Sequence, residues 1–204
     1  MKKKIILIVL GILLLAGIGV GVYWFVNRDK EDEGPKNKAA IVDRIDGYDY
    51  TLDDRDTKIF KDEFQNLKTI LTGDEIDYDA YAESLAKLFV IDFYTLSTKI
   101  NKYDVGCLEY LKDTDTETFK SKAGDTLYKY VEDDTNHKRV QTLPEVKSIV
   151  DTDLSTEGDT YSVTIEWDYQ KDLEYDNKAV IKFIKIDNKL YLEDYSPETE
   201  ENQD

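Results

Sequence analysis

Apolar residues follow a helical period in the first half of the region after residue 40. Between Phe60 and Leu71 they recur at spacings of three and four, which predicts a helix with one buried face. Asp53 or Asp54 is the expected N-cap of this helix, and Gly73 is expected to end it.

Two further helices are predicted by the same period, one from about residue 77 to 99 and one over 116–131. The run LFVI at 88–91 makes the second helix the most buried element. Residues 48–52 are expected to be extended, and 101–106 form a break between the second and third helices.

The period changes to two after Pro144. Residues 161–169 alternate apolar and polar side chains without interruption, so Trp167 and the other odd-numbered residues line one face of a strand. Three further strands are expected, over 146–154, 179–186 and 189–195, the last two joined by a tight turn.

These elements predict an α+β fold class, with about three helices packed on one face of a four-stranded antiparallel curved sheet. The strands are consecutive and their connections are short, which favours antiparallel pairing. The acidic segment 196–204 lacks apolar residues and is expected to be disordered.

An apolar segment without a single charge occupies residues 5–26. A helix of this length, at about 1.5 Å rise per residue, crosses the roughly 30 Å hydrocarbon core of a bilayer. Ile5 and Leu14 belong to its lipid-facing stretch, and Trp24 suits the membrane–water interface. A cleaved signal peptide is the alternative, but its apolar region is about 7–15 residues long and ends in small residues. The sequence therefore predicts a retained signal anchor.

The charges beside this span predict its orientation. Residues 2–4 are all lysine, whereas Arg28 and Lys30 on the other side lie among acidic residues. Because the denser positive flank stays inside, we expect a cytoplasmic tail over 1–4 and everything after the span outside the cell membrane. A lipoprotein is excluded, because no cysteine closes the apolar run.

Gly17 and Gly21 form a G-x-x-x-G motif within the span. Such a motif lets two helix backbones approach closely and would support a homodimer through the transmembrane helix. Glycine is also common in membrane helices that do not dimerise, so both interpretations stay open.

A charged linker is expected over 27–40, because Gly34 and Pro35 occur there without an apolar period. The extracytoplasmic domain then spans 41–195. Residues 31–204 contain 43 acidic and 22 basic residues, a formal charge of −21. This balance excludes nucleic acid as a partner and disfavours peripheral binding to anionic lipid, since both draw on clustered lysine and arginine. The whole chain has 15 tyrosines, 7 phenylalanines and 2 tryptophans, and only Tyr23, Trp24 and Phe25 of these lie in the span, so the domain must have a core.

The layout of a short cytoplasmic tail, one span, a polar linker, several helices and then a curved antiparallel sheet resembles the membrane-tethered members of the nuclear transport factor 2-like superfamily. The resemblance covers residues 41–195 in outline and rests on layout, since the superfamily has no signature residues. The functional relatives nearest in layout are scaffold subunits of bacterial type IV secretion and conjugation machines. The resemblance implies a cone-like domain with a scaffold or binding role in a bacterial cell envelope.

Motifs for metal binding and histidine-based catalysis fail on spacing. The acidic segments that begin at Asp113 and Asp151 lack the glycine and glutamate that a calcium loop needs at its sixth and twelfth positions. His137 is the only histidine and lies in a polar run. Cys107, the only cysteine, is expected to be a packed side chain rather than a reactive thiol. No cofactor is expected.

Asp92 lies between Ile91 and Phe93 in the most apolar predicted helix, where packing would bury its charge. A buried carboxylate needs a partner. In the structural interpretation, Asp92 forms a hydrogen bond with a tyrosine hydroxyl or a backbone amide, or lies at the solvent-exposed edge of the helix. In the functional interpretation, it is a general base at the bottom of an aromatic-lined pocket that includes Trp167.

The sequence therefore predicts a membrane-anchored, non-enzymatic scaffold or protein-interaction module, whose partners are other envelope proteins. The alternative is a small-ligand binder or enzyme that uses the pocket with Asp92 at its base and Trp167 in its wall. A cavity of several hundred cubic ångströms with convergent polar groups would favour the alternative, and a filled interior would favour the interaction module.

Overall fold

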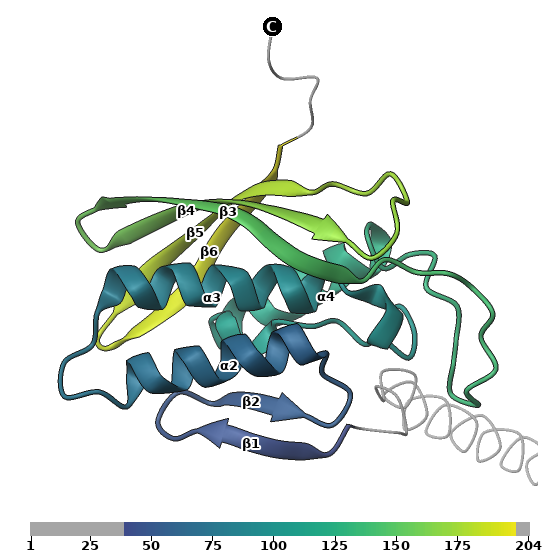
Figure 1. Ribbon diagram of the computed structural model, residues 1–204, viewed down its shortest axis with the longest axis horizontal. Coiled ribbons are helices and arrows are strands. Elements are labelled where there is room, and N and C mark those ends of the chain that lie inside the picture. The colour runs from purple at the N-terminus through teal and green to yellow at the C-terminus, as the bar shows by residue number, and fades with distance from the viewer. Residues whose placement is uncertain (1–38, 199–204) are drawn as a thin grey trace, which may run out of the picture. The chain divides into compact units, whose positions relative to one another are not determined.

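Six strands, three helices and two 3₁₀ turns make up residues 39–198, the part of the chain that the computed structural model describes. In chain order they are β1 (Ile41–Ile45), β2 (Tyr50–Asp53), α2 (Lys58–Leu71), α3 (Tyr78–Phe93), η1 (Leu96–Thr98), η2 (Leu108–Tyr110), α4 (Asp113–Asp125), β3 (Val146–Glu157), β4 (Thr160–Tyr169), β5 (Lys178–Ile186) and β6 (Lys189–Pro197). Figure 1 shows the sheet as one layer, α3 and α4 below it, α2 on the other side of α3, and the β1–β2 hairpin below α2. The predicted α+β class is confirmed.

Several predicted features lie outside the described residues. They are the cytoplasmic tail, the linker up to residue 38, residues 199–204, and the span with Ile5, Leu14, Gly17, Gly21 and Trp24. Within residues 39–198, none of the helices has the length and apolar character needed to cross a membrane.

Helix α2 has the predicted buried face but a different cap. Thr57 is the N-cap, and its hydroxyl accepts a hydrogen bond from the Phe60 N–H at 3.4 Å. The prediction of Asp53 or Asp54 is wrong, because Asp53 ends strand β2 and Asp54 accepts from the Ala40 N–H at 3.1 Å instead. The buried residues of the helix are Phe60, Phe64, Leu67 and Leu71.

Helix α3 begins as predicted and ends six residues early. The Asp77 carboxylate caps it by accepting from the Ala80 N–H at 3.1 Å. The helix stops at Phe93 because the chain turns toward the segment before β3, where the Leu96 N–H donates to the Pro144 carbonyl at 2.9 Å. Nearly the whole circumference of α3 is buried, as the LFVI run predicted.

Helix α4 is displaced from the prediction of 116–131. It starts at Asp113, and the carboxylates of Asp113 and Asp115 lie in its first turn, where the helix dipole favours negative charge. It ends six residues early because the Tyr128 N–H bonds to the Ala123 carbonyl in a wide turn. The fully buried Tyr128 then donates its hydroxyl to the Phe93 carbonyl at 2.9 Å.

The four-stranded sheet has the order β3-β4-β5-β6, antiparallel throughout, as predicted. Strand β6 runs two residues past its predicted end, and Ser196 and Pro197 pair with Val180 and Ala179. The expectation of disorder over 196–204 is therefore wrong for its first three residues, since the Glu198 N–H also donates to the Lys178 carbonyl at 2.9 Å. Backbone pairing to a neighbouring strand holds them, and this requires no apolar side chain.

The β1–β2 hairpin was only half predicted. Residues 48–52 are extended in part, as β2, but no pattern indicated β1, whose residues are mostly exposed. The hairpin is closed at its open end by a pair of hydrogen bonds between Ala40 and Asp54. On its other side the Lys68 ammonium from α2 pairs with Asp43 at 2.7 Å.

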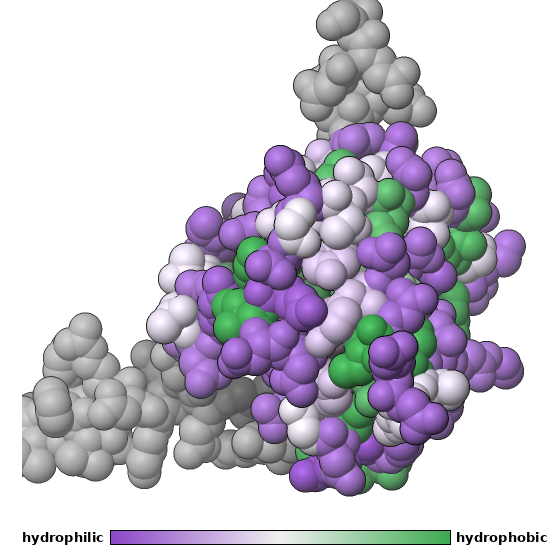
Figure 2. Space-filling view, turned by 90° about the vertical axis from the view of Figure 1, so that its left-hand side faces the viewer, coloured by the Kyte–Doolittle hydropathy of each residue, from purple (hydrophilic) through white to green (hydrophobic). Residues whose placement is uncertain are grey.

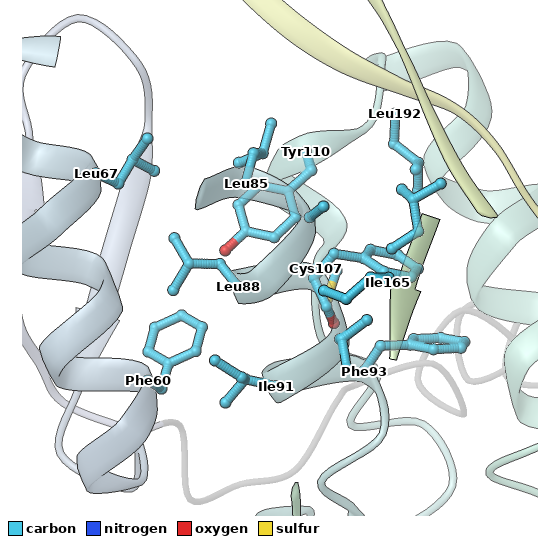
Figure 3. Packing of buried hydrophobic residues seen from close by; sticks show 14 of the residues in the cluster. Phe60, Leu67, Leu85, Leu88, Ile91, Phe93, Cys107, Tyr110, Ile165 and Leu192 are labelled. Carbon is cyan, nitrogen blue, oxygen red and sulfur yellow. The ribbon is translucent and has the colours of Figure 1, made fainter. Parts of the chain in front are cut away.

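The interior between the sheet and the helices is filled. Val163, Ile165 and Trp167 on β4 are all 0% exposed, and α3 packs against β3 and β4, so the predicted buried face is confirmed for these residues. Tyr169, at the end of the same face, is only partly buried. Figure 3 shows Phe60 and Leu67 of α2 turned toward α3, whose side chains continue the same packed core.

The side of the molecule seen in Figure 2 is mostly hydrophilic, and its apolar patches are small and separated by polar residues. Apart from these small patches, this face is therefore exposed to solvent as a polar surface.

Candidate functional site

Asp92 lies in the last turn of α3, and two partners use its two carboxylate oxygens. Oδ1 forms an ion pair with the Lys99 ammonium, and Oδ2 accepts a hydrogen bond from the Cys107 N–H at 2.7 Å. The Asp92 and Lys99 side chains are only 17% and 10% exposed. A backbone amide is one of the partners that the structural interpretation expected, whereas the lysine was not anticipated.

Burial alone would lower the pKa of Lys99, because it penalises the charged ammonium. The Asp92 carboxylate outweighs this effect and raises the pKa of Lys99 above its usual range. The lysine is therefore a fixed positive charge that holds η1 against the end of α3.

The loop that approaches Asp92 from the other side contains Gly106 and Cys107. A Cβ atom at position 106 would overlap the Asp92 carboxylate, so only glycine fits there. Cys107 has a left-handed backbone (φ 66°), and its thiol lies 3.3 Å from the Phe89 carbonyl. Burial raises the pKa of this thiol, so it stays protonated, and its packed role is confirmed.

A polar cavity of about 190 Å³ opens beside this pair. Its charged lining residues are Asp53, Arg55, Asp56, Asp92, Lys99, Asp104 and Glu109. Among them, Arg55 pairs with Asp104 at 2.8 Å. Five carboxylates and two cations leave an excess of negative charge in a half-buried space.

Two carboxyl groups at this cavity have pKa values raised mainly by burial. Burial, reinforced by the Asp92 charge, raises the pKa of Glu109 to about 8. Burial also raises the pKa of Asp56 to about 6, although the Asp53 N–H donates to its carboxylate at 2.7 Å and opposes the shift. Both groups exchange protons near neutral pH, which is the property that a general acid or base requires.

Trp167 borders a different hollow. This second space of about 660 Å³ lies beside the β4–β5 loop and is lined by Trp167, Asp168, Tyr169, Asp172, Glu174, Tyr175, Asp176, Asn177 and Glu198. The Trp167 ring packs on Tyr94 with the centroids 4.6 Å apart. Burial raises the pKa of Tyr169, and the nearby Trp167 N–H opposes that rise without reaching the geometry of a hydrogen bond. Asp92 and Trp167 therefore do not line one pocket.

The segments that the sequence analysis excluded as metal or catalytic motifs lie in ordinary helices, strands and loops. The segment beginning at Asp113 forms the first turn of α4, and Asp151 lies on β3. His137 is exposed in the loop before β3, with a positive φ of 53°. Within residues 39–198, no cluster of three or more histidine, cysteine or acidic side chains is arranged to hold a metal ion.

The sequence identified Asp92 but missed Lys99, Glu109 and Asp56. Lys99 had a readable signal, since it is a lone cation within an apolar segment that also contains Asp92. Glu109 and Asp56 had none, because only the folded chain brings η2 and the end of β2 beside α3.

No family model, no curated protein and no solved structure matches the chain.

Proposed function

We propose that this chain is a membrane-anchored, extracytoplasmic scaffold or protein-interaction module of a bacterial cell envelope, with a fold of the nuclear transport factor 2-like kind. The helices that precede a four-stranded antiparallel sheet are compatible with that fold. The apolar segment 5–26 and its lysine flank support the anchor and the orientation.

The filled interior carries the proposal. A ligand binder of this layout would keep space between the sheet and the helices, but Val163 and Ile165 are fully buried there. The 660 Å³ hollow that Trp167 borders is lined by the end of β4, the β4–β5 loop and Glu198, and by no helix residue, so it lies outside this interior. The charged groups beside α3 are largely engaged with one another, and Asp92 is occupied by Lys99 and a backbone N–H. Contacts between the domain and other molecules are therefore expected at its outer surface.

One outer surface is suited to a first test. Strand β3 is at the edge of the sheet, and a bulge after Ile149 leaves Val150 54% exposed. The groove beside it measures about 430 Å³, and Ile59 and Ile91 contribute apolar side chains to it.

A photo-crosslinking amino acid at Val150, in the full chain in intact cells, tests the interaction role. Ile186 is the matched control, because it is also β-branched and 41% exposed but lies at the β5–β6 turn. We expect a discrete adduct with an envelope protein from position 150 and none from position 186. Absence of adducts from position 150 and from every other exposed position scanned would count against an interaction module.

A second function, small-ligand binding or catalysis at the Asp92 cavity, is favoured by one observation. Two carboxyl groups there, Glu109 and Asp56, have pKa values raised toward neutrality, which is a common property of functional sites. Stability separates the two roles. If the Asp92 ion pair is structural, Asp92→Asn destabilises the fold, whereas removal of a charge kept for function often leaves stability unchanged or improved.

A further inference from the structure

Seven large hydrophobic side chains are exposed within residues 39–198, and five of them lie at one end of the domain. The five are Ile41 (53% exposed), Val42 (58%), Tyr103 (51%), Tyr130 (72%) and Val140 (94%). We call these five residues the entry end, because Ile41 follows the first described residues, 39 and 40. The other two, Val150 and Ile186, lie elsewhere on the sheet.

Hydrogen bonds and an ion pair connect the hairpin to the loop that carries Tyr103. The Asp54 N–H donates to the Ala40 carbonyl at 3.0 Å, which places the start of β1 beside Arg55. Arg55 then pairs with Asp104 at 2.8 Å, next to Tyr103 in the chain. The start of β1 and the loop that carries Tyr103 therefore lie at the same end of the domain, although about sixty residues separate them in sequence.

The same loop is bonded to the segment that carries Tyr130 and Val140. The Asp134 N–H donates to the Ile100 carbonyl at 2.8 Å. Gln141, directly after Val140, donates its side-chain amide to the Tyr130 carbonyl at 2.8 Å. Figure 1 shows the long connection between α4 and β3 on the same side as the start of β1.

The side chains of the entry end have the character of a membrane–water interface. The ammonium of Lys102 lies 4.9 Å from the centre of the Tyr103 ring, and that of Lys129 lies 5.2 Å from the Tyr130 ring. Tyrosine beside lysine is favoured where an apolar ring enters the headgroup region and the cation stays in water. Val140 projects almost fully into solvent without any polar atom to satisfy.

Chain connectivity indicates which surface this end would meet. If 5–26 spans the membrane, only residues 27–38 separate the bilayer from the entry end, a reach of at most about 40 Å. A tether this short gives the domain a high effective concentration at the bilayer surface, so a few apolar side chains suffice for contact.

We propose that the entry end contacts the headgroup region of the membrane that holds the anchor, with Tyr130 and Val140 entering the lipid. This contact rests on the proposed anchor. It does not depend on anionic lipid, because Glu132, Asp133 and Asp134 lie in the same loop. The carboxylate of Asp133 accepts hydrogen bonds from the Thr135 N–H and hydroxyl, which lower its pKa and keep it charged. A zwitterionic bilayer is therefore sufficient.

The test uses the full chain in phosphatidylcholine liposomes, labelled with an environment-sensitive fluorophore at Val140→Cys. The control is Ile186→Cys, an exposed apolar position that is not part of the entry end. Native Cys107 is 1% exposed and stays unlabelled under native conditions, which the unsubstituted chain verifies. We expect lipid that carries a quencher near its headgroup to remove most of the fluorescence at position 140 and little at position 186.

Each other outcome overturns the proposal in a distinguishable way. Weak and equal quenching at both positions, in protein that resists alkaline extraction, rejects the lipid contact and leaves the anchor intact. A blue-shifted label at position 140 that lipid does not quench means that protein, such as a second copy, covers this end instead. Release of the chain by alkaline extraction rejects the anchor itself.

Discussion

Replacement of Asp92 by asparagine should be among the most damaging polar substitutions in the domain. Asparagine keeps an oxygen that accepts from the Cys107 N–H, but it removes the charge opposite Lys99. Lys99 then loses the one carboxylate with which it forms an ion pair among the described residues, and Asp56 and Glu109 are near it without pairing with it. Removal of one partner of a buried ion pair costs about 3–5 kcal/mol. That is a large part of the roughly 5–15 kcal/mol by which a domain is stable.

Urea unfolding of the fragment 39–198 measures this loss, with the fluorescence of Trp167 as the signal. Trp167 is the only tryptophan in that fragment and is fully buried, so its emission should change on unfolding. Asp62→Asn is the matched control, because the Asp62 and Lys58 side chains of its ion pair are 64% and 89% exposed. An exposed pair contributes little, so the control should unfold close to the unsubstituted fragment.

The double variant Asp92→Asn with Lys99→Met isolates the interaction between the two charges. If the pair is buried and coupled, the double variant should lose clearly less stability than the sum of the two single losses. A loss below about 1 kcal/mol for Asp92→Asn would contradict a buried, coupled ion pair, since this is the range of an ordinary surface substitution. If the stability lost by the double variant equals the sum of the two single losses, the two charges do not interact, which would also contradict a coupled pair.

Three further predictions concern the same fragment. Trp167→Ala should cost about 3–5 kcal/mol in urea unfolding followed by circular dichroism, since this variant has no tryptophan; the ring is fully buried, and a loss below about 1 kcal/mol would contradict a filled interior. Gly106→Ala should lower the melting temperature, because the added methyl group overlaps Asp92, whereas Gly73→Ala, with only ordinary contacts, should not. Stability should fall as pH rises from about 4.5 to about 8, because folded Glu109 holds its proton over that range and the unfolded chain does not. Glu109→Gln removes this titration and should flatten the decline seen in unfolding at several pH values; an unchanged slope would mean that Glu109 is not protonated in the fold.

The sheet was predictable because its signal is local. Alternation over 161–169 places every second side chain on one face, and a strand has no other way to bury Val163, Ile165 and Trp167 together. The buried face of α2 was predictable for the same reason, since a helical period requires no knowledge of the partner.

The helix ends were set by contacts that a period cannot reveal. Leu96 continues the apolar period of α3, but its N–H bonds to the Pro144 carbonyl, more than forty residues away in the chain. Tyr128 likewise fits the period of α4, but its hydroxyl donates to the Phe93 carbonyl and the chain leaves the helix to reach it. In both cases a long-range hydrogen bond prevailed over local propensity.

The candidate site was half predictable. The position of Asp92 within apolar residues indicated a buried carboxylate that needs a partner, and the structure supplies two. The loop from Gly106 to Glu109 could not be placed beside it, because no periodic pattern connects a loop to a helix. The alternative interpretation placed Asp92 and Trp167 in one aromatic-lined pocket, but they border separate hollows.

We propose that the domain stands outside the membrane on a retained anchor. Ile186→Cys, expressed in the full chain, tests it directly, because position 186 is exposed and Cys107 is buried. We predict that a membrane-impermeant thiol reagent labels intact cells as fully as permeabilised cells, and that the labelled chain is found at full length in the membrane fraction. Labelling that requires permeabilisation, or a labelled soluble form that begins near Asn27, would contradict the account.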